Sequence, residues 1–110
     1  MTETPAEVAR TEERGQPVVR VRGEVDMVNA ELVGEQIRAA VRLDGPVTLD
    51  LNQVDFFDSS GLRMLQQLSD ELEREGGRLT VVTAPESIVG RLLTLTHMDT
   101  YLHVTGSPPG

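Results

Sequence analysis

The chain has 110 residues, which fits one domain by the usual prior of about 150 residues per domain. Hydrophobic residues make up 38% and charged residues 25%, a composition typical of a folded globular protein. Cysteine is absent, which excludes disulfides, thiolate metal sites and a cysteine nucleophile. The 18 acidic residues outnumber the 10 basic ones, which disfavours binding to nucleic acid or to an anionic membrane surface.

No apolar run reaches the roughly 18 residues that a membrane span needs. The start of the chain is polar and acidic and lacks the apolar core of a secretory signal. Together with the missing cysteine, these features predict a cytoplasmic protein without a membrane partner.

The first half of the chain predicts a hairpin, a helix and a strand. Residues 7–11 and 18–22 predict two antiparallel strands joined by a polar turn at 12–15, with Gly23 ending the second strand. Asn29 then stands where a helix begins, and its side chain is expected to cap free backbone N–H groups. The apolar spacing over 33–41 predicts the helix itself, and the alternation over 47–52 predicts a strand.

The second half continues with alternating strands and helices. An apolar cluster at 54–57 precedes a polar segment, and a leucine stripe over 62–72 predicts a helix that ends at Gly76-Gly77. A strand over 79–82, a helix that opens at 85–87 and a last strand over 101–104 follow. The tails, 1–5 and 105–110, are predicted to be flexible.

This order of elements predicts the fold class. Strands that alternate with helices pair in parallel through right-handed crossovers, and the first two strands add an antiparallel hairpin. We therefore expect a single α/β domain over residues 1–110, with its core at about 7–104 and a mixed, mostly parallel sheet.

Most catalytic constellations are missing from the sequence. His97 and His103 come late in the chain without a nucleophilic serine elbow, and their spacing resembles no zinc site. A phosphate-binding loop ending in lysine is impossible because the chain has no lysine. We expect His97 in a loop and His103 on a surface strand, and we expect neither enzymatic activity nor a cofactor or metal.

One segment carries more polar groups than a helix start requires: Asp58-Ser59-Ser60-Gly61-Leu62. Taken alone it is better explained as a helix cap than as a functional site. Two features favour function, since three hydrogen-bonding residues occur in succession and Gly61 costs about 1 kcal/mol inside a helix. That glycine predicts the close approach of another protein's backbone.

The chain as a whole resembles the anti-sigma factor antagonist family, whose fold is the STAS domain. The resemblance covers residues 18–104 and is most specific at Asp58-Ser59-Ser60-Gly61-Leu62. Weaker matches precede and follow it in the expected order: Gly23-Glu24-Val25-Asp26, Val47-Thr48-Leu49-Asp50-Leu51 and Gly76-Gly77.

The resemblance implies a phosphorylation switch. The second serine of the motif, Ser60, is the residue that a partner anti-sigma factor with serine kinase activity modifies. The unphosphorylated antagonist binds that kinase and frees a sigma factor, phosphorylation releases the antagonist, and a serine phosphatase resets it. The partner-binding residues carried over by position are Asp26, Asn29, Asp58, Ser59, Ser60, Gly61 and Leu62.

Two departures and one ambiguity accompany the resemblance. Asn29 stands where many members have threonine, and the further C-terminal helix of many members is expected to be missing here. If Ser59 is the helix cap, its hydroxyl is occupied and Ser60 is freer, but the reverse assignment stays open because helix boundaries shift by a residue or two. The alternative function is a STAS subunit of a lipid-transport ATPase complex or of a stress-signalling complex.

Overall fold

Two antiparallel strands open the fold in the computed structural model, which describes residues 6–106. Strand β1 (Glu7–Glu13) pairs with β2 (Gln16–Val25). The predicted hairpin is therefore confirmed, but its turn is shorter than the expected four residues. Only Arg14 and Gly15 connect the strands, and both have positive φ angles of 56° and 79°, which suit a tight hairpin turn.

The sheet has five strands in the order β1-β2-β3-β4-β5, and every pair after the hairpin is parallel. The predicted α/β class and the mixed, mostly parallel sheet are confirmed. The remaining elements are α1 (Ala30–Ala40), β3 (Pro46–Phe57), α2 (Ser59–Arg74), β4 (Arg78–Val82), α3 (Ile88–Leu95), α4 (Met98–Tyr101) and β5 (His103–Thr105).

Two strand boundaries differ from the prediction because the β2–β3 pairing is irregular. Strand β2 continues past Gly23, where it was expected to end, since a φ of 100° lets this glycine sit beside a register shift. Strand β3 is one strand rather than a strand and a separate apolar cluster. A second register shift, between Arg20 and Arg22, interrupts the alternation of buried residues along β3 and so hides its continuity in the sequence.

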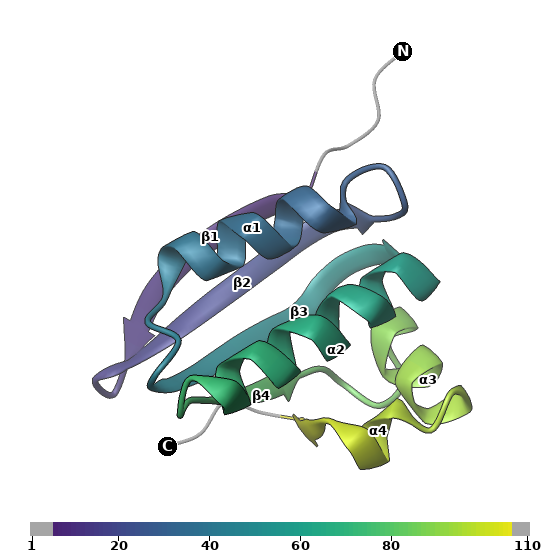
Figure 1. The fold of residues 1–110 in the computed structure, drawn as a ribbon. Helices are drawn as coiled ribbons and strands as arrows, with labels where there is room; N and C mark the ends of the chain where they lie inside the picture. The colour runs from purple at the N-terminus through teal and green to yellow at the C-terminus, as the bar shows by residue number, and fades with distance from the viewer. Residues whose placement is uncertain (1–5, 107–110) are drawn as a thin grey trace.

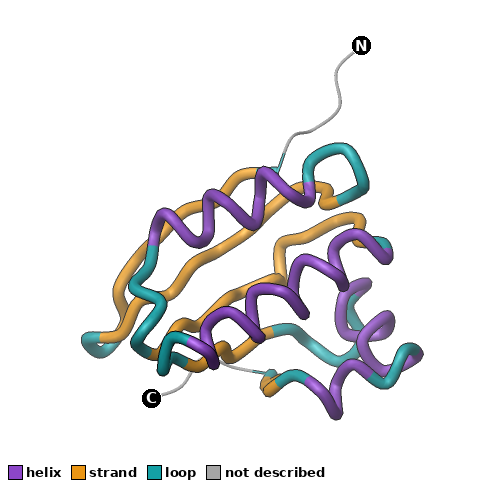
Figure 2. Tube along the Cα trace, in the orientation of Figure 1, coloured by secondary structure: helices purple, strands orange, loops and turns teal. Residues whose placement is uncertain are grey.

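Helices α1 and α2 lie side by side over one face of the sheet (Figures 1 and 2). Their apolar stripes, predicted from the spacing, are buried against the sheet, with α1 over β1 and β2 and α2 over β3 and β4. The two helices are also linked by an ion pair between Arg38 and Glu71. The fully buried side chains of this core include Val19, Val21, Val25, Ile37, Leu49, Leu51, Leu65, Leu68, Leu72 and Val81.

Glycine ends α2 as expected. Gly76 has a φ of 90°, and the Gly77 amide donates to the carbonyl of Leu72 at 2.7 Å, which satisfies one of the last helical carbonyls. A side chain on Gly77 would also collide with the Leu43 carbonyl, because a Cβ there would lie 2.3 Å from its oxygen. The turn therefore requires glycine twice, for conformation and for space.

The C-terminal elements were predicted only in part. Ser87 caps α3 by accepting from the Gly90 amide at 3.0 Å, where the opening of a helix was expected. The single-turn helix α4 was missed, and β5 begins two residues later than predicted because this turn occupies Tyr101. The Tyr101 hydroxyl donates to Asp70 on α2 at 2.5 Å, a bond that raises the pKa of Tyr101.

Both histidines are exposed, His97 in the turn before α4 and His103 on β5, as predicted. The predicted C-terminal tail begins too early, since Thr105 belongs to β5. The tail predictions for 1–5 and 107–110 lie outside the described residues. Across the described range, no helix combines the length and apolarity needed to cross a membrane.

Candidate functional site

Two strand-to-helix junctions lie next to each other at the carboxyl edge of the sheet. Val25, the last residue of β2, pairs in parallel with Phe57, the last residue of β3. Asp26 and Asp58 follow these two residues directly. The structure therefore brings Asp26 to the same edge of the sheet as Ser60, where an α/β sheet usually presents its sites.

The first junction is held by the side chains of Asp26 and Asn29. One carboxylate oxygen of Asp26 accepts from the Val28 amide at 2.9 Å and from the Asn29 amide at 3.3 Å. The Asn29 side chain points back along the chain, where its Oδ1 accepts from the Asp26 amide at 3.0 Å and its Nδ2 donates to the Glu24 carbonyl at 2.8 Å.

The predicted capping role of Asn29 is wrong. The residue does precede α1, but it has helical rather than extended backbone angles, and its side chain makes no capping bond. Both ends of its amide are used by the strand terminus instead. Asn29 therefore fixes the path of the loop between β2 and α1.

The second junction passes from β3 into α2 through one residue. Asp58 is the N-cap, with an extended backbone, and its carboxylate accepts from the Ser60 amide at 2.9 Å. Neither serine is therefore the cap, contrary to both assignments left open by the sequence, because the Asp58 carboxylate takes the position. Ser59 is exposed and Ser60 half-buried, and neither hydroxyl forms a hydrogen bond within residues 6–106.

Gly61 is required by packing inside the domain. It is buried, and a Cβ added to it would lie 2.5 Å from the Phe57 ring, well inside contact distance. This contact gives a structural reason for the glycine, and the close approach of another protein's backbone stays a prediction. Leu62 is half-buried and packs against the core cluster, so these two motif residues chiefly anchor the start of α2.

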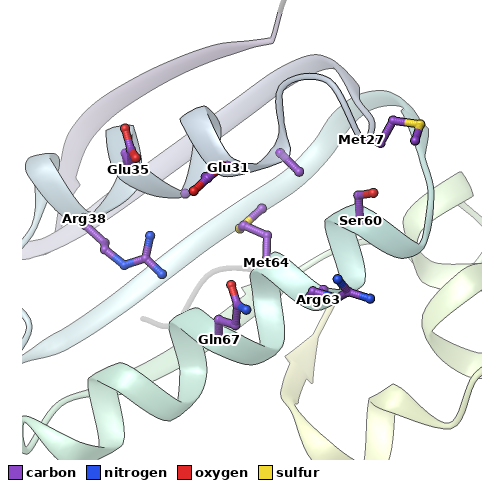
Figure 3. Close-up of a pocket in the computed structure, with 10 residues that line it drawn as sticks. Met27, Glu31, Glu35, Arg38, Ser60, Arg63, Met64 and Gln67 are labelled. Carbon is purple, nitrogen blue, oxygen red and sulfur yellow. The ribbon is translucent and has the colours of Figure 1, made fainter.

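A groove of about 420 Å³ runs between α1 and α2 (Figure 3). Ser60 lies at one end of it, next to Met27 from the first junction, and the Arg38 side chain lies toward the other end. Ser59 is not part of its lining. The residues that line it are Met27, Ala30, Glu31, Gly34, Glu35, Arg38, Ser60, Arg63, Met64 and Gln67.

Exposed apolar side chains flank this end of the groove. Met27 is 79% exposed and Val28 80%, both in the loop between β2 and α1, and Leu32 in the first turns of α1 is 55% exposed. Of these three side chains only Met27 lines the groove itself, and we call the group Met27, Val28 and Leu32 the apolar rim. The sequence prediction does not include this group, although Met27 and Val28, two apolar residues outside any stripe, were a visible signal.

The charged groups of the site are carboxylates and guanidinium groups that are not clustered as metal ligands would be. Within residues 6–106, no three His, Asp or Glu side chains are grouped so that they could hold a metal ion. The arrangement instead offers two unbonded serine hydroxyls, two carboxylates held by backbone amides and an apolar rim.

Comparison with known proteins gives one matching family. The model of the STAS domain family matches residues 7–107. The chain is 31% identical over 77 residues to Osmosensory protein A of Mycobacterium tuberculosis, a match that covers 67% of this chain and 49% of that protein. The chain thus spans about half the length of this curated relative.

Solved structures share the fold. An anti-sigma factor antagonist from Mycobacterium paratuberculosis is 28% identical, with a TM-score of 0.78 over 96% of this chain and 92% of that chain. The Bacillus cell fate determinant SpoIIAA, solved in its phosphorylated form, is 20% identical, with a TM-score of 0.58 over 92% of this chain and 93% of that chain. At that identity SpoIIAA supports the fold alone.

Proposed function

The chain belongs to the STAS domain family, and from this premise we propose that it is an anti-sigma factor antagonist controlled by phosphorylation of Ser60. The unphosphorylated form binds an anti-sigma factor that is a serine kinase and so frees a sigma factor. Phosphate on Ser60 releases the antagonist, and a serine phosphatase restores it. The exchange takes place in the cytoplasm, and the antagonist itself catalyses no reaction.

The observation that carries this proposal is the setting of the Ser60 hydroxyl. It forms no hydrogen bond within the described part of the chain, and it lies in the groove beside the exposed side chain of Met27. A kinase needs a hydroxyl that is available at a surface where it can dock. The 28% identity to an anti-sigma factor antagonist supports the same role.

Capping by Ser59 no longer explains the preference for Ser60 over Ser59. Because Asp58 is the cap, both hydroxyls are free of capping bonds, and Ser59 is the more exposed. Ser60 is favoured by the family pattern and by its place in the groove. A partner that covers the apolar rim at Met27 would have Ser60 at the edge of its footprint.

Release follows from the charge of the phosphate. Phosphorylation adds a charge of about −1.5 to −2 at an edge that already carries Asp26 and Asp58. A partner docked on Ser60 would have to remove this group from water beside two carboxylates, and desolvating such a charge costs several kcal/mol. The isolated domain keeps the phosphate in water, so its fold stays the same. Ser60→Asp imitates the release only partly, since it has less charge.

The direct test incubates the protein with candidate serine kinases and ATP and maps the phosphate by mass spectrometry. We expect modification at Ser60, none in Ser60→Ala, and full modification in the matched control Ser59→Ala. Ser60→Ala should also remain bound to the kinase in the presence of ATP. Stoichiometric phosphate on Ser59, or labelling of Ser60→Ala at the wild-type level, would overturn the assignment.

A second candidate function rests on the match to Osmosensory protein A. The chain resembles about half of that protein, which favours a STAS module in a stress-signalling assembly. A STAS subunit of a lipid-transport ATPase complex is the other alternative. Purification of the tagged chain from its source distinguishes the three, because a serine kinase, a multi-protein sensor or transporter subunits would co-purify.

A further inference from the structure

Arg63 lies one helical turn after Ser60 on α2. Residues three apart on a helix project from the same side, with Cβ atoms about 5 to 6 Å apart. The structure agrees with this expectation, since Ser60 and Arg63 both line the groove between α1 and α2 (Figure 3). A long arginine side chain at this spacing reaches a group that extends from the Ser60 hydroxyl.

The Arg63 guanidinium is available for a new contact. Within residues 6–106 it forms neither an ion pair nor a hydrogen bond, and Arg63 is exposed to solvent. The other arginine in the groove, Arg38, is held by Glu71 on α2. Arg63 is therefore the cation of the groove that can take a new anionic partner without breaking an existing bond.

We propose that Arg63 pairs with the phosphate on Ser60 and holds the modified side chain against α2. This proposal rests on the proposed function, because it concerns the phosphorylated state of the same serine. Arginine matches phosphate well, since its planar guanidinium donates two parallel hydrogen bonds to two phosphate oxygens. Arg63 is a positioning residue that fixes the phosphate and cancels part of its charge.

Other charged groups around the groove oppose this pair. Glu31 and Glu35 face it from α1, Asp58 stands at the start of α2, and Asp26 lies at the neighbouring junction. These carboxylates disfavour the doubly charged phosphate, whereas Arg63 favours it. The phosphate's second ionisation therefore reports directly on whether Arg63 is engaged.

The experiment installs phosphoserine at position 60 during translation, so that no kinase is required, and follows the ³¹P resonance from pH 4 to pH 9. We compare the otherwise native chain with Arg63→Gln, with Arg63→Lys and with the matched control Arg74→Gln. Arg74 is an exposed arginine of the last turn of α2. Circular dichroism of each variant confirms that it is folded.

We expect Arg63→Gln to move the titration midpoint to higher pH by about 0.2 to 0.7 unit, the range that a solvent-exposed charge pair produces. The midpoint of Arg63→Lys should lie between those of the parent and Arg63→Gln, because lysine keeps the charge but not the paired donors. The midpoint of Arg74→Gln should equal that of the parent chain. Equal midpoints in the parent and Arg63→Gln would overturn the proposal, as would an equal shift in Arg74→Gln.

This result is independent of the kinase test. If no kinase modifies Ser60 but the midpoint shifts as expected, the proposed function fails. The pairing of Arg63 with a phosphate on Ser60 is then correct, but no kinase supplies that phosphate. If the kinase modifies Ser60 and the midpoints coincide, the proposed function stands and the role of Arg63 is rejected.

Discussion

The two strand-to-helix junctions at the carboxyl edge begin with the same kind of hydrogen bond but continue differently. In both, an aspartate directly after a strand accepts from a backbone amide two residues later, Val28 for Asp26 and Ser60 for Asp58. After Asp58 the helix begins at once, whereas three residues separate Asp26 from α1. The short junction presents hydroxyls beside a groove, and the long one presents exposed apolar side chains.

The junctions are also stabilised differently. The longer junction, between β2 and α1, depends on the hydrogen bonds that the Asp26 and Asn29 side chains form, because Met27 and Val28 bury little surface. The short one has one capping bond and is fixed by the packing of Gly61 on the Phe57 ring. The same aspartate–amide contact can therefore precede either a loop or a helix, and the residues that follow determine which one forms.

The largest expected effect is on the packed junction. Gly61→Ala should lower the free energy of unfolding by about 1 to 3 kcal/mol, because the new methyl group overlaps the Phe57 ring. This loss runs against helix propensity, which favours alanine by about 1 kcal/mol. Urea denaturation followed by circular dichroism measures the change.

Gly34→Ala on α1 is the matched control for that substitution. Its Cβ would lie 3.1 Å from Nη1 of Arg38 and from Cγ of Met64, a tight contact but a wider one than the 2.5 Å at Gly61. Its stability should therefore stay within about 1 kcal/mol of the parent. A Gly61→Ala chain as stable as Gly34→Ala would show that packing does not distinguish the short junction.

The next effect is on the long junction. Asp26→Ala removes the acceptor for two backbone amides, so the free energy of unfolding should fall by about 1 to 2 kcal/mol. Asp26→Asn keeps a side-chain oxygen at the same place and should recover most of the loss. Because it removes the charge and keeps the bond, Asp26→Asn is also the variant for measuring how the carboxylate affects affinity for the kinase.

Asp58→Ala should cost less, about 1 kcal/mol, since it removes one capping bond at the start of α2. Asp58→Asn, a good capping residue, should lie within a few tenths of a kcal/mol of the parent. Thermal unfolding of the four aspartate variants under one set of conditions ranks them. A larger loss at Asp58 than at Asp26 would reverse the assignment of which junction depends on polar bonds.

The smallest effect on stability is expected at the apolar rim. The double variant Met27→Ser/Val28→Ser should unfold within about 0.5 kcal/mol of the parent, because both side chains are mostly in water already. Its affinity for the kinase partner should fall at least tenfold, measured by calorimetric titration. Unchanged affinity would exclude the rim from the docking surface.

Sequence periodicity was sufficient for the helices that cover the sheet. The stripes of α1 and α2 are buried as predicted because an amphipathic helix must turn one side to the core. The meeting of the two aspartates follows from general topology, since the ends of neighbouring parallel strands lie at one edge. These features depend on local pattern and on general topology.

The errors have a common cause in the directions in which strands and side chains meet. The continuity of β3 depends on its register against β2, and the need for glycine at 61 depends on a ring four residues earlier that is fixed by the sheet. The role of Asn29 depends on the direction in which the β2 terminus presents its amide and carbonyl groups. None of these directions is encoded in the spacing of apolar residues.

The order of the strands in the sheet has a consequence for how the chain folds. Each strand pairs with its neighbour in sequence, so no strand must insert between two that are already paired. The hairpin can form first, and each later strand then joins after one crossover, which holds α1, α2 or the pair α3 and α4, so the entropy lost per step is limited. During synthesis from the N-terminus the sheet can grow outward one strand at a time, so the edges open to mispairing are β1 and the strand most recently made.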